Sequence, residues 1–494
     1  MTKISENHIE DWVLEVLQSK GYTFMSPEKL DPDFPGSLRE RYNDVILNDF
    51  LQEALVKINP GISLQSIGQA IKDVERVVTY GDLVACNQYF QKLLTEGVDV
   101  TFLEKGEERT QKVWLVDAVN PGNNIWVVTH QMTVIENGQN KRPDVIIFLN
   151  GMPVIVVELK NAVDEAATID KAYQQLKTYH AAIPSLFCYN LLEIVSDGLE
   201  AKVGTITADI SRFMSWKTAD GKTIAGRTTS ELGVMMDGLL NTTTLLDMFV
   251  NFTVFENYSY EDQHTKTIQI GVAKKIAAYH QYYAVKKAVI STATASAEDG
   301  NKKGGVVWHT QGSGKSLSMV FFTGLLVKEL NNPTIIVITD RNDLDDQLFE
   351  TFANCKQLLR QVPQQIESRS HLVKELKNRQ SGGIFFTTIQ KFLPEDVGTQ
   401  FEQLSDRRNI IVLADEAHRT QYGFEAKTRF IKDKDGNEIG TEITYGFAKH
   451  MHDALPNATF VGFTGTPVES TDKNTKAVFG EYVDVYDIER AVKD

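Results

Sequence analysis

Two acidic residues and a lysine lie around two short apolar segments in the first third of the chain. Asp144 precedes the segment VIIFL, and Glu158 and Lys160 lie at the end of the segment VIVVELK. Two carboxylates can hold Mg²⁺ against a scissile phosphate, and a lysine can orient or deprotonate the attacking water. Carboxylate oxygens suit Mg²⁺ rather than zinc. These residue types therefore indicate metal-dependent hydrolysis of a phosphodiester.

The pairing of the two segments decides whether these side chains can meet. Glu158 and Lys160 share a face because side chains alternate along a strand. A strict two-residue turn at Asn150-Gly151 would put Asp144 on the opposite face from Glu158. We therefore expect either a loop of odd length or a β-bulge, since each restores a shared face.

Three residues on predicted helices could complete this site. Gln175 and Tyr179 stand four residues apart, and so on one face of a helix. Glu10, on the first predicted helix, could add a further acidic ligand. The alternative is that the acids and the lysine are ordinary residues at strand starts and exposed edges.

A phosphate-binding pattern follows the apolar segment GVVW and opens a predicted helix. It consists of Thr310, Gln311, Gly312, Ser313, Gly314, Lys315 and Ser316. Glycines let backbone N–H groups close on phosphates, and a helix N-terminus favours negative charge. Lys315 would reach the β- and γ-phosphates, and the Ser316 hydroxyl would hold Mg²⁺. The pattern departs from GxxxxGK[ST] at its first position, which is His309.

Adjacent acids end a later apolar run, NIIVLA. Asp415 can bind Mg²⁺ through its hydration shell, and Glu416 can polarise the attacking water. From residue 305 onward, short apolar runs alternate with helical patterns, which indicates a parallel α/β sheet.

With these motifs in order, the second half of the chain resembles the first RecA-like lobe of superfamily 2 helicases. The matching segments are TDRNDLDDQ (339–347), FTTIQKF (386–392), DEAH (415–418) and TGTP (464–467). The resemblance implies that Gln281 reads adenine and that His418 belongs to the box begun by Asp415 and Glu416.

The first half resembles the RecB-like branch of the PD-(D/E)xK nucleases. The resemblance is carried by RPD (142–144), by ExK (158–160) and by QxxxY (175–179). In that branch the glutamine and tyrosine lie beside the metal site and the DNA, which implies this position for Gln175 and Tyr179.

A nuclease placed before a superfamily 2 motor resembles the R subunit of type I restriction–modification enzymes. The resemblance implies ATP-driven translocation of double-stranded DNA and Mg²⁺-dependent cleavage distant from an unmethylated recognition sequence. It also implies a partner, the methyltransferase core of modification and specificity subunits, which brings S-adenosylmethionine to the complete complex. Base recognition would belong to that core, since contacts to phosphates carry no sequence information.

The expected fold class is α/β: a nuclease domain with a mixed sheet flanked by helices, then a RecA-like parallel α/β lobe. We expect the nuclease domain over 1–230, the motor lobe over 231–468 and the truncated start of a second lobe over 469–494. Such an N-terminal fragment should bind nucleotide without translocating DNA. Helices are predicted over 242–256 and 266–289, and a connector over 291–304.

Composition sets weaker limits. The formal net charge of −15 argues against a protein that simply coats DNA, although a local basic track would suffice for contact. Three separated cysteines argue against a zinc site or a disulfide framework. The polar N-terminus and the lack of a long apolar run predict a cytoplasmic protein with no membrane partner.

Three other functions stay open. A nuclease–helicase of DNA repair would not depend on a methyltransferase or on unmethylated sites. A degenerate nuclease fold could serve as a DNA clamp, although such clamps usually lose one of the catalytic residues. A standalone remodelling ATPase would leave the nuclease motif unexplained.

Overall fold

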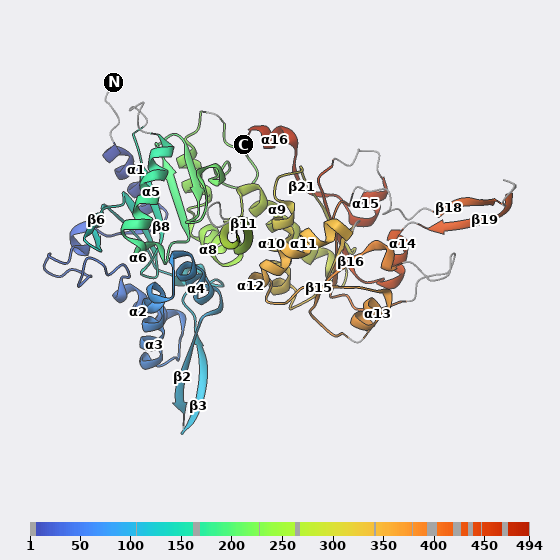
Figure 1. The fold of residues 1–494 in the computed structure, drawn as a ribbon, viewed down its shortest axis with the longest axis horizontal. Coiled ribbons are helices and arrows are strands. Elements are labelled where there is room, and N and C mark those ends of the chain that lie inside the picture. The colour runs from blue at the N-terminus through green and yellow to red at the C-terminus, as the bar shows by residue number, and fades with distance from the viewer. Residues whose placement is uncertain are drawn as a thin grey trace. The chain divides into compact units, whose positions relative to one another are not determined.

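The structure is a computed structural model in which two compact units are described (Figure 1). The units are Met1–Tyr279 and His280–Asp494. The described residues are 6–104, 106–161, 168–226, 228–261, 267–339, 342–377, 379–392, 403–417, 426–432, 438–445, 447–466 and 473–493.

A six-stranded mixed sheet forms the centre of the first unit. Its strands are, in spatial order, β1 (Thr23–Phe24), β4 (Trp126–His130), β7 (Val145–Leu149), β8 (Met152–Leu159), β9 (Leu192–Ser196) and β10 (Ala201–Gly204). The strands β7, β8 and β9 are buried along their whole length. Their apolar sequences therefore supply the core of this unit.

Helices flank this sheet, and α1 and α5 contact the strands that carry the candidate site. The α-helices are α1 (Glu6–Ser19), α2 (Asn48–Ile58), α3 (Leu64–Glu75), α4 (Leu83–Glu96), α5 (Ile169–Ala182), α6 (Pro184–Phe187), α7 (Glu231–Gly238) and α8 (Thr242–Asn251). The 3₁₀ helices are η1 (Pro27–Leu30), η2 (Arg76–Thr79), η3 (Pro121–Asn123) and η4 (Ile210–Arg212). In α1, the buried residues Ile9, Val13 and Leu17 recur every four positions and form its packing face.

Three antiparallel hairpins complete the first unit. They pair β2 (Val98–Glu104) with β3 (Glu107–Val113), β5 (Val134–Glu136) with β6 (Gln139–Lys141), and β11 (Thr253–Glu261) with β12 (Ile268–Ile276).

The second unit contains a seven-stranded parallel sheet. Its spatial order is β15 (Gln364–Gln365), β16 (Ile384–Thr388), β14 (Thr334–Thr339), β17 (Ile410–Ala414), β20 (Thr459–Thr464), β13 (Lys303–His309) and β21 (Tyr482–Tyr486). In the parallel order, the carboxyl ends of β13, β17 and β20 meet at one edge of the sheet, where ligands bind in open α/β folds.

The helices of the second unit connect these strands. They are α9 (Tyr279–Ser296), α10 (Lys315–Glu329), α11 (Asn342–Asn354), α12 (Lys356–Leu359), α13 (Arg369–Lys377), η5 (Ile389–Phe392), α14 (Phe447–Ala454), α15 (Lys473–Phe479) and α16 (Ile488–Lys493). A separate hairpin pairs β18 (Ala426–Lys432) with β19 (Glu438–Tyr445). The predicted fold class, a mixed sheet with helices followed by a parallel α/β lobe, is confirmed.

The helices predicted over 242–256 and 266–289 are only partly present. The helix α8 ends at Asn251, and the β11–β12 hairpin occupies the residues between α8 and α9. In β12, Ile268, Ile270 and Val272 alternate with polar or small residues, and pairing with β11 overrides the helical spacing. The helix α9 then continues to Ser296, inside the predicted connector 291–304.

The division into units also differs from the predicted limits. The expected boundary after residue 230 falls inside the first unit. Later residues are held there by polar contacts: Lys274 Nζ donates to Asn87 Oδ1 (2.8 Å), and the Lys274 carbonyl accepts from Thr205 Oγ1 (2.8 Å). At the other end, β21 pairs with β13, so the segment expected to begin a second lobe adds an edge strand to this sheet.

Lys274 makes the stability of the first unit depend on pH. Burial lowers its pKa to about 7, although the charge of Glu193 opposes the shift. The unfolded lysine titrates near pH ~10.4, so between about pH 7 and 10 the unfolded chain binds more protons and stability should rise with pH. Lys274→Met should remove up to about 1.4 kcal/mol per pH unit of this rise.

Urea denaturation at several pH values between 7 and 9.5 measures this effect. Lys275→Met is the matched control, because Lys275 is the exposed neighbour in β12 and pairs with Glu256. Equal pH dependence of the two variants would contradict the prediction.

Candidate functional site

The turn between β7 and β8 is fixed by its two residues. Asn150 and Gly151 both have positive φ, 52° and 81°. This is the backbone of a tight two-residue hairpin turn. A Cβ on Gly151 would collide with the carbonyl oxygen of Leu47. The Asn150 side chain accepts from Ile125 N (2.7 Å) and donates to Leu115 O (2.8 Å), which anchors the turn.

A β-bulge follows the turn, as predicted from the sequence. The pairing of β7 with β8 shifts register by one residue between Ile147 and Phe148. As a result, Val145 lies opposite Val157 instead of Val156. Continued by one residue, this register sets Asp144 opposite Glu158. Residues opposite each other in an antiparallel pair have side chains on the same face. The predicted bulge is confirmed. The turn itself has two residues, but a two-residue hairpin without a bulge is excluded.

The two carboxylates are deeply buried, and one of them, Glu158, has an oxygen without a hydrogen-bond partner in the part of the chain that the structure describes. Asp144 is 5% exposed, and its Oδ2 accepts from Leu159 N (2.7 Å). Glu158 is 2% exposed, and its Oε1 accepts from Lys160 Nζ (2.7 Å). Among the described residues, Glu158 Oε2 is buried without a hydrogen-bond partner. An acceptor left open in this way is a position that a cation can occupy.

The helix α1 brings Glu10 to this site through a shared amide. Gln131 Nε2 donates both to Asp144 Oδ1 (3.1 Å) and to Glu10 Oε1 (3.0 Å). The other oxygen of Glu10 lies 3.4 Å from His130 Nδ1. Gln131 and His130 are absent from the sequence prediction, because no spacing links the end of β4 to residues in β7 and β8. Only the sheet order brings them together.

The helix α5 contributes Tyr179 and Gln175. Tyr179 is buried, and its hydroxyl donates to Arg142 O (3.3 Å). Burial, followed by the charge of Glu158, raises the pKa of Tyr179, while a hydrogen bond with Gln175 opposes the shift. The phenol therefore stays protonated and can donate a hydrogen bond at neutral pH. The structure thus brings Gln175, Tyr179, Glu158 and Asp144 into one place.

Burial dominates the electrostatics of these acids. It raises the pKa of Glu158 to about 8, with a further rise from Asp144 and an opposing effect of Lys160. Burial and the charge of Asp144 also raise the pKa of Glu10, against hydrogen bonds from His130 and Gln131. Nearby acids that resist ionisation together are relieved by a cation.

The donor set fits a divalent cation held by two carboxylates. Within the described ranges, no group of three or more His, Cys, Asp and Glu residues has the arrangement of a metal cluster. The fit therefore rests on Asp144, Glu158 and the open oxygen Oε2 of Glu158, with backbone oxygens and water to complete the ligand set.

The second unit carries the phosphate loop between β13 and α10. Gly312 and Gly314 have φ of 85° and 80°, and α10 begins at Lys315. Gln281 of α9 donates to Gly314 O (3.0 Å) and to Ser313 O (3.3 Å). The positive φ of Gly314 favours glycine, and a Cβ there would also displace the Gln281 amide from its contacts with the loop.

The remaining loop residues lie around this turn. Thr310 N donates to the carbonyl of Tyr486 (2.9 Å), and Ser313 Oγ donates to Thr310 O (2.6 Å). Gln311 and Ser316 are exposed, the latter in the first turn of α10. This leaves the Ser316 hydroxyl accessible to a ligand.

Acids at the end of β17 meet the loop lysine. Lys315 Nζ pairs with Glu416 Oε1 (2.8 Å), and Glu416 N donates to Asp415 Oδ1 (3.0 Å). Gly465 lies beside Lys315, because a Cβ on it would meet Nζ at 2.8 Å. Three motifs therefore converge at the carboxyl edge of the sheet. The predicted residue His418 lies outside the described residues, as do Asp340, Arg341 and Pro467 of the quoted motifs.

His309 explains the departure from the loop pattern. Its side chain is fully buried, and its Nε2 lies 3.2 Å from Asp484 Oδ2 in β21. Lys287 of α9 also donates to Asp484 (2.7 Å). Burial opposes ionisation of Asp484, but the contacts with His309 and Lys287 outweigh it and lower the pKa of this carboxyl. The histidine binds the loop to the edge strand, a contact that the motif alone does not reveal.

Comparison with known families agrees with the two units. Residues 3–212 match the family of the type I restriction enzyme R protein N terminus, and residues 280–494 match the SWI2/SNF2 ATPase family. The chain joins an R-protein N-terminal region to a SWI2/SNF2 ATPase domain. The family predicted from the sequence is therefore confirmed.

Curated relatives align with nearly all of this chain. The HindI endonuclease subunit of a type I restriction enzyme from Haemophilus influenzae is 44% identical over 99% of this chain and 45% of its own length. A Methanocaldococcus jannaschii protein, provisionally named the MjaIXP endonuclease subunit, is 32% identical over 99% and 45%. The chain thus spans less than half the length of these relatives.

A solved structure of the type ISP enzyme LlaGI, a nuclease-deletion mutant with a DNA substrate mimic, is 16% identical. The match covers 44% of this chain and 20% of the solved chain, at a TM-score of 0.28. Among the described residues, no helix is both long and apolar enough to cross a membrane.

The raised pKa of Glu158 predicts pH-dependent metal binding. Below about pH 8 a proton competes with the metal, so the apparent affinity for Mg²⁺ should weaken by up to about tenfold per pH unit as pH falls. Calorimetric titration of the nucleotide-free chain at pH 6–8.5 measures this dependence. Glu158→Gln should abolish it, whereas Glu200→Gln, at an exposed position, should not. A pH-independent affinity would contradict the role of Glu158.

The contacts of Gln281 allow two roles to be separated. If it reads adenine, Gln281→Ala should weaken ATP binding by about tenfold and leave GTP binding unchanged, since a lost hydrogen bond is worth about 1 kcal/mol or more. Competition against a fluorescent nucleotide measures both affinities. An equal loss for ATP and GTP would show that Gln281 only supports Ser313 and Gly314.

Proposed function

We propose that this chain provides the nuclease and the first motor lobe of the endonuclease subunit of a type I restriction enzyme. The observation that carries the proposal is the β7–β8 bulge, which gives Asp144 and Glu158 a shared face beside Lys160. The proposed reaction is Mg²⁺-dependent cleavage of double-stranded DNA away from an unmethylated recognition sequence. ATP hydrolysis in the second unit drives translocation.

In the nuclease site, Asp144 and Glu158 hold Mg²⁺, which when bound neutralises charge on the scissile phosphate and activates water. Lys160 orients or deprotonates that water. The Tyr179 hydroxyl, which stays protonated, serves as a hydrogen-bond donor, and Gln175 supports it from the preceding turn of α5. The low exposure of both acids keeps bulk water from screening these charges.

In the motor site, Lys315 binds the nucleotide phosphates, Gln281 reads adenine, and Ser316 and Asp415 hold Mg²⁺. Glu416 orients the attacking water. The Lys315–Glu416 ion pair supports this assignment, because phosphate binding would draw Lys315 away and free the Glu416 carboxylate for water. His418 completes the same box in this proposal.

The proposed partners follow from the family. A methyltransferase core of modification and specificity subunits would select the site and use S-adenosylmethionine, while this chain contacts the DNA backbone. The HindI and MjaIXP proteins are named as endonuclease subunits, which supports this assembly. A cytoplasmic location fits such a complex.

The test is cleavage of unmethylated circular DNA by the assembled enzyme with ATP and Mg²⁺. We expect Lys160→Ala to translocate and hydrolyse ATP without cutting, with cleavage reduced at least about 10³-fold. Lys315→Ala should do neither. Cleavage that needs neither partner subunits nor ATP would assign the chain to repair nucleases. Metal-dependent DNA binding without cleavage by the parent would assign it to DNA clamps.

A further inference from the structure

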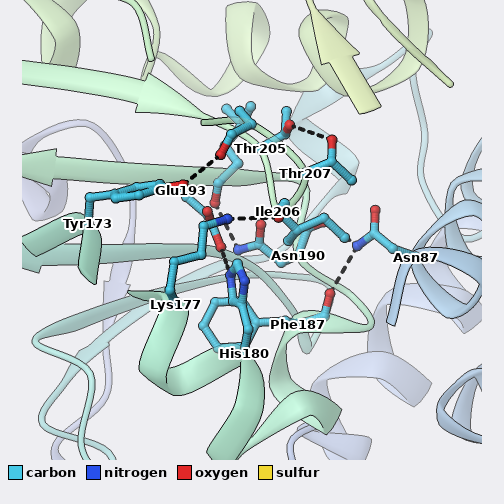
Figure 2. A network of polar contacts seen from close by, with 12 residues as sticks. Asn87, Tyr173, Lys177, His180, Phe187, Asn190, Glu193, Thr205, Ile206 and Thr207 are labelled. Carbon is cyan, nitrogen blue, oxygen red and sulfur yellow. Dashed lines mark hydrogen bonds and ion pairs between the residues drawn. The ribbon is translucent and has the colours of Figure 1, made fainter. Parts of the chain in front are cut away.

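A buried polar network adjoins the candidate nuclease site, but none of its residues is assigned a role there (Figure 2). At its centre, Glu193 of β9 is fully buried, and its Oε1 is paired with His180 Nε2 of α5. Its Oε2 is buried and has no hydrogen-bond partner among the described residues. Figure 2 shows His180, Lys177 and Tyr173 of α5 extending from the helix toward Glu193 and the segment around Ile206.

Glu193 and Glu158 lie on the same face of the sheet. The parallel strands β8 and β9 pair Glu158 with Val195 and Val156 with Glu193. Because side chains alternate along each strand, the two carboxylates point to one side, two residues apart along the strands. The helix α5 packs against both strands. It therefore lies over both carboxylates.

The helix α5 presents a separate set of side chains to each carboxylate. Gln175 and Tyr179, four residues apart, serve the nuclease site. Tyr173, Lys177 and His180, at positions i, i+4 and i+7, form an adjacent stripe over Glu193 and the residues that follow it. A rotation of the helix that displaced one stripe would displace the other.

The second stripe is anchored at three points. His180 pairs with Glu193 and packs edge-on against Phe187, with ring centroids 4.5 Å apart. Lys177 Nζ donates to Ile206 O (3.1 Å). Tyr173 donates to Ala208 O (3.2 Å) and lies under the Lys177 ammonium, 5.0 Å from the ring centroid. These directional contacts are all satisfied at only one orientation of α5 about its axis. Apolar packing alone would not select that orientation.

A buried carboxylate such as Glu193 is not expected to increase the stability of the fold by itself. Apolar residues of similar volume usually hold two elements together as well or better, because they avoid desolvating a charge. Glu193 sits in the most buried part of the sheet with one oxygen open, so its energetic advantage must lie elsewhere. A fixed geometry at α5 is the advantage that its contacts provide.

We propose that Glu193 and His180 form a positioning contact that fixes the rotation of α5. The contact thereby keeps Gln175 and Tyr179 beside the candidate metal ligands. Neither Glu193 nor His180 touches DNA or metal in this arrangement, since both act through the helix. The inference deepens the proposed nuclease function and rests on it.

The decisive variant replaces the pair by apolar residues of similar size, Glu193→Leu with His180→Phe. The phenyl ring retains the contact with Phe187, and neither member of the pair is left without the other. Lys274 loses the opposing charge of Glu193, so thermal unfolding is compared at pH 8 or above, where this buried lysine is largely neutral, and the variant should unfold there at the parent's temperature or above. In the assembled enzyme, we expect the cleavage rate at saturating DNA to fall about tenfold or more. The DNA concentration for half-saturation and the ATPase rate should stay within about twofold of the parent.

A spectroscopic signal tests the placement of Tyr179 without relying on activity. In protein labelled with 3-fluorotyrosine, the ¹⁹F resonance of Tyr179 is assigned by its loss in Tyr179→Phe. It should shift or broaden in the double variant, while Thr178→Ala, on the exposed face of α5, should leave both this resonance and cleavage unchanged. Glu193→Gln is the second variant should the double variant not fold, and it too should move the resonance.

Two results would overturn the positioning contact. One is a double variant that is as stable as the parent and cleaves at the parent's rate. The other is an unmoved Tyr179 resonance in every folded variant, even if cleavage falls. A parent enzyme that does not cleave would instead refute the proposed nuclease, and the ¹⁹F shift would still decide whether the pair positions α5.

Discussion

A one-residue shift of register between β7 and β8 is the constraint on which the first unit depends. Without it, Asp144 and Glu158 would lie on opposite faces of the sheet, and no side-chain rotation could bring them to one cation. The shift is confined between a two-residue turn locked by Asn150 and the rigid, fully buried strand β8. The neighbouring elements complete the site: Gln131, directly after β4, reaches Asp144 because β4 pairs with β7, and Tyr179 approaches from the helix that contacts β8 and β9.

Burial of two acidic side chains raises their pKa values and makes their ionised forms less stable. Burial, and after it the charge of Asp144, raises the pKa of Glu158 and of Glu10. A cation bound here would favour the ionised carboxylates, so metal binding and ionisation would be coupled. In the second unit the solution differs. Lys315 and Glu416 form an ion pair there, and in the proposed function a phosphate would compete with Glu416 for the lysine.

Short motifs identified many of the residues that the structure brings together at the two candidate sites, because the chemistry expected of them requires fixed residue types at fixed spacing. The need for a shared face even predicted the bulge, although the sequence could not place it at one residue. Contacts between distant segments were not predictable. Gln131 reaches Asp144 only because β4 lies next to β7, and His309 reaches Asp484 only because β21 joins the sheet beside β13. The β11–β12 hairpin was mistaken for helix because apolar residues there satisfy both periods, and cross-strand pairing decided between them.

Three of the eight described non-glycine residues with positive φ lie in or beside the two candidate sites. Non-glycine residues with positive φ include Gln131 and Asn150 in the first unit and Glu416 in the second. Each such conformation costs of order 1–3 kcal/mol unless surrounding contacts impose it. The contacts are present: Gln131 bridges two carboxylates, Asn150 bonds to the backbone of Ile125 and Leu115, and Glu416 pairs with Lys315. These three residues are therefore held by the same interactions that build the candidate sites, so relaxing the backbone at any of them would alter the geometry that the proposed chemistry requires.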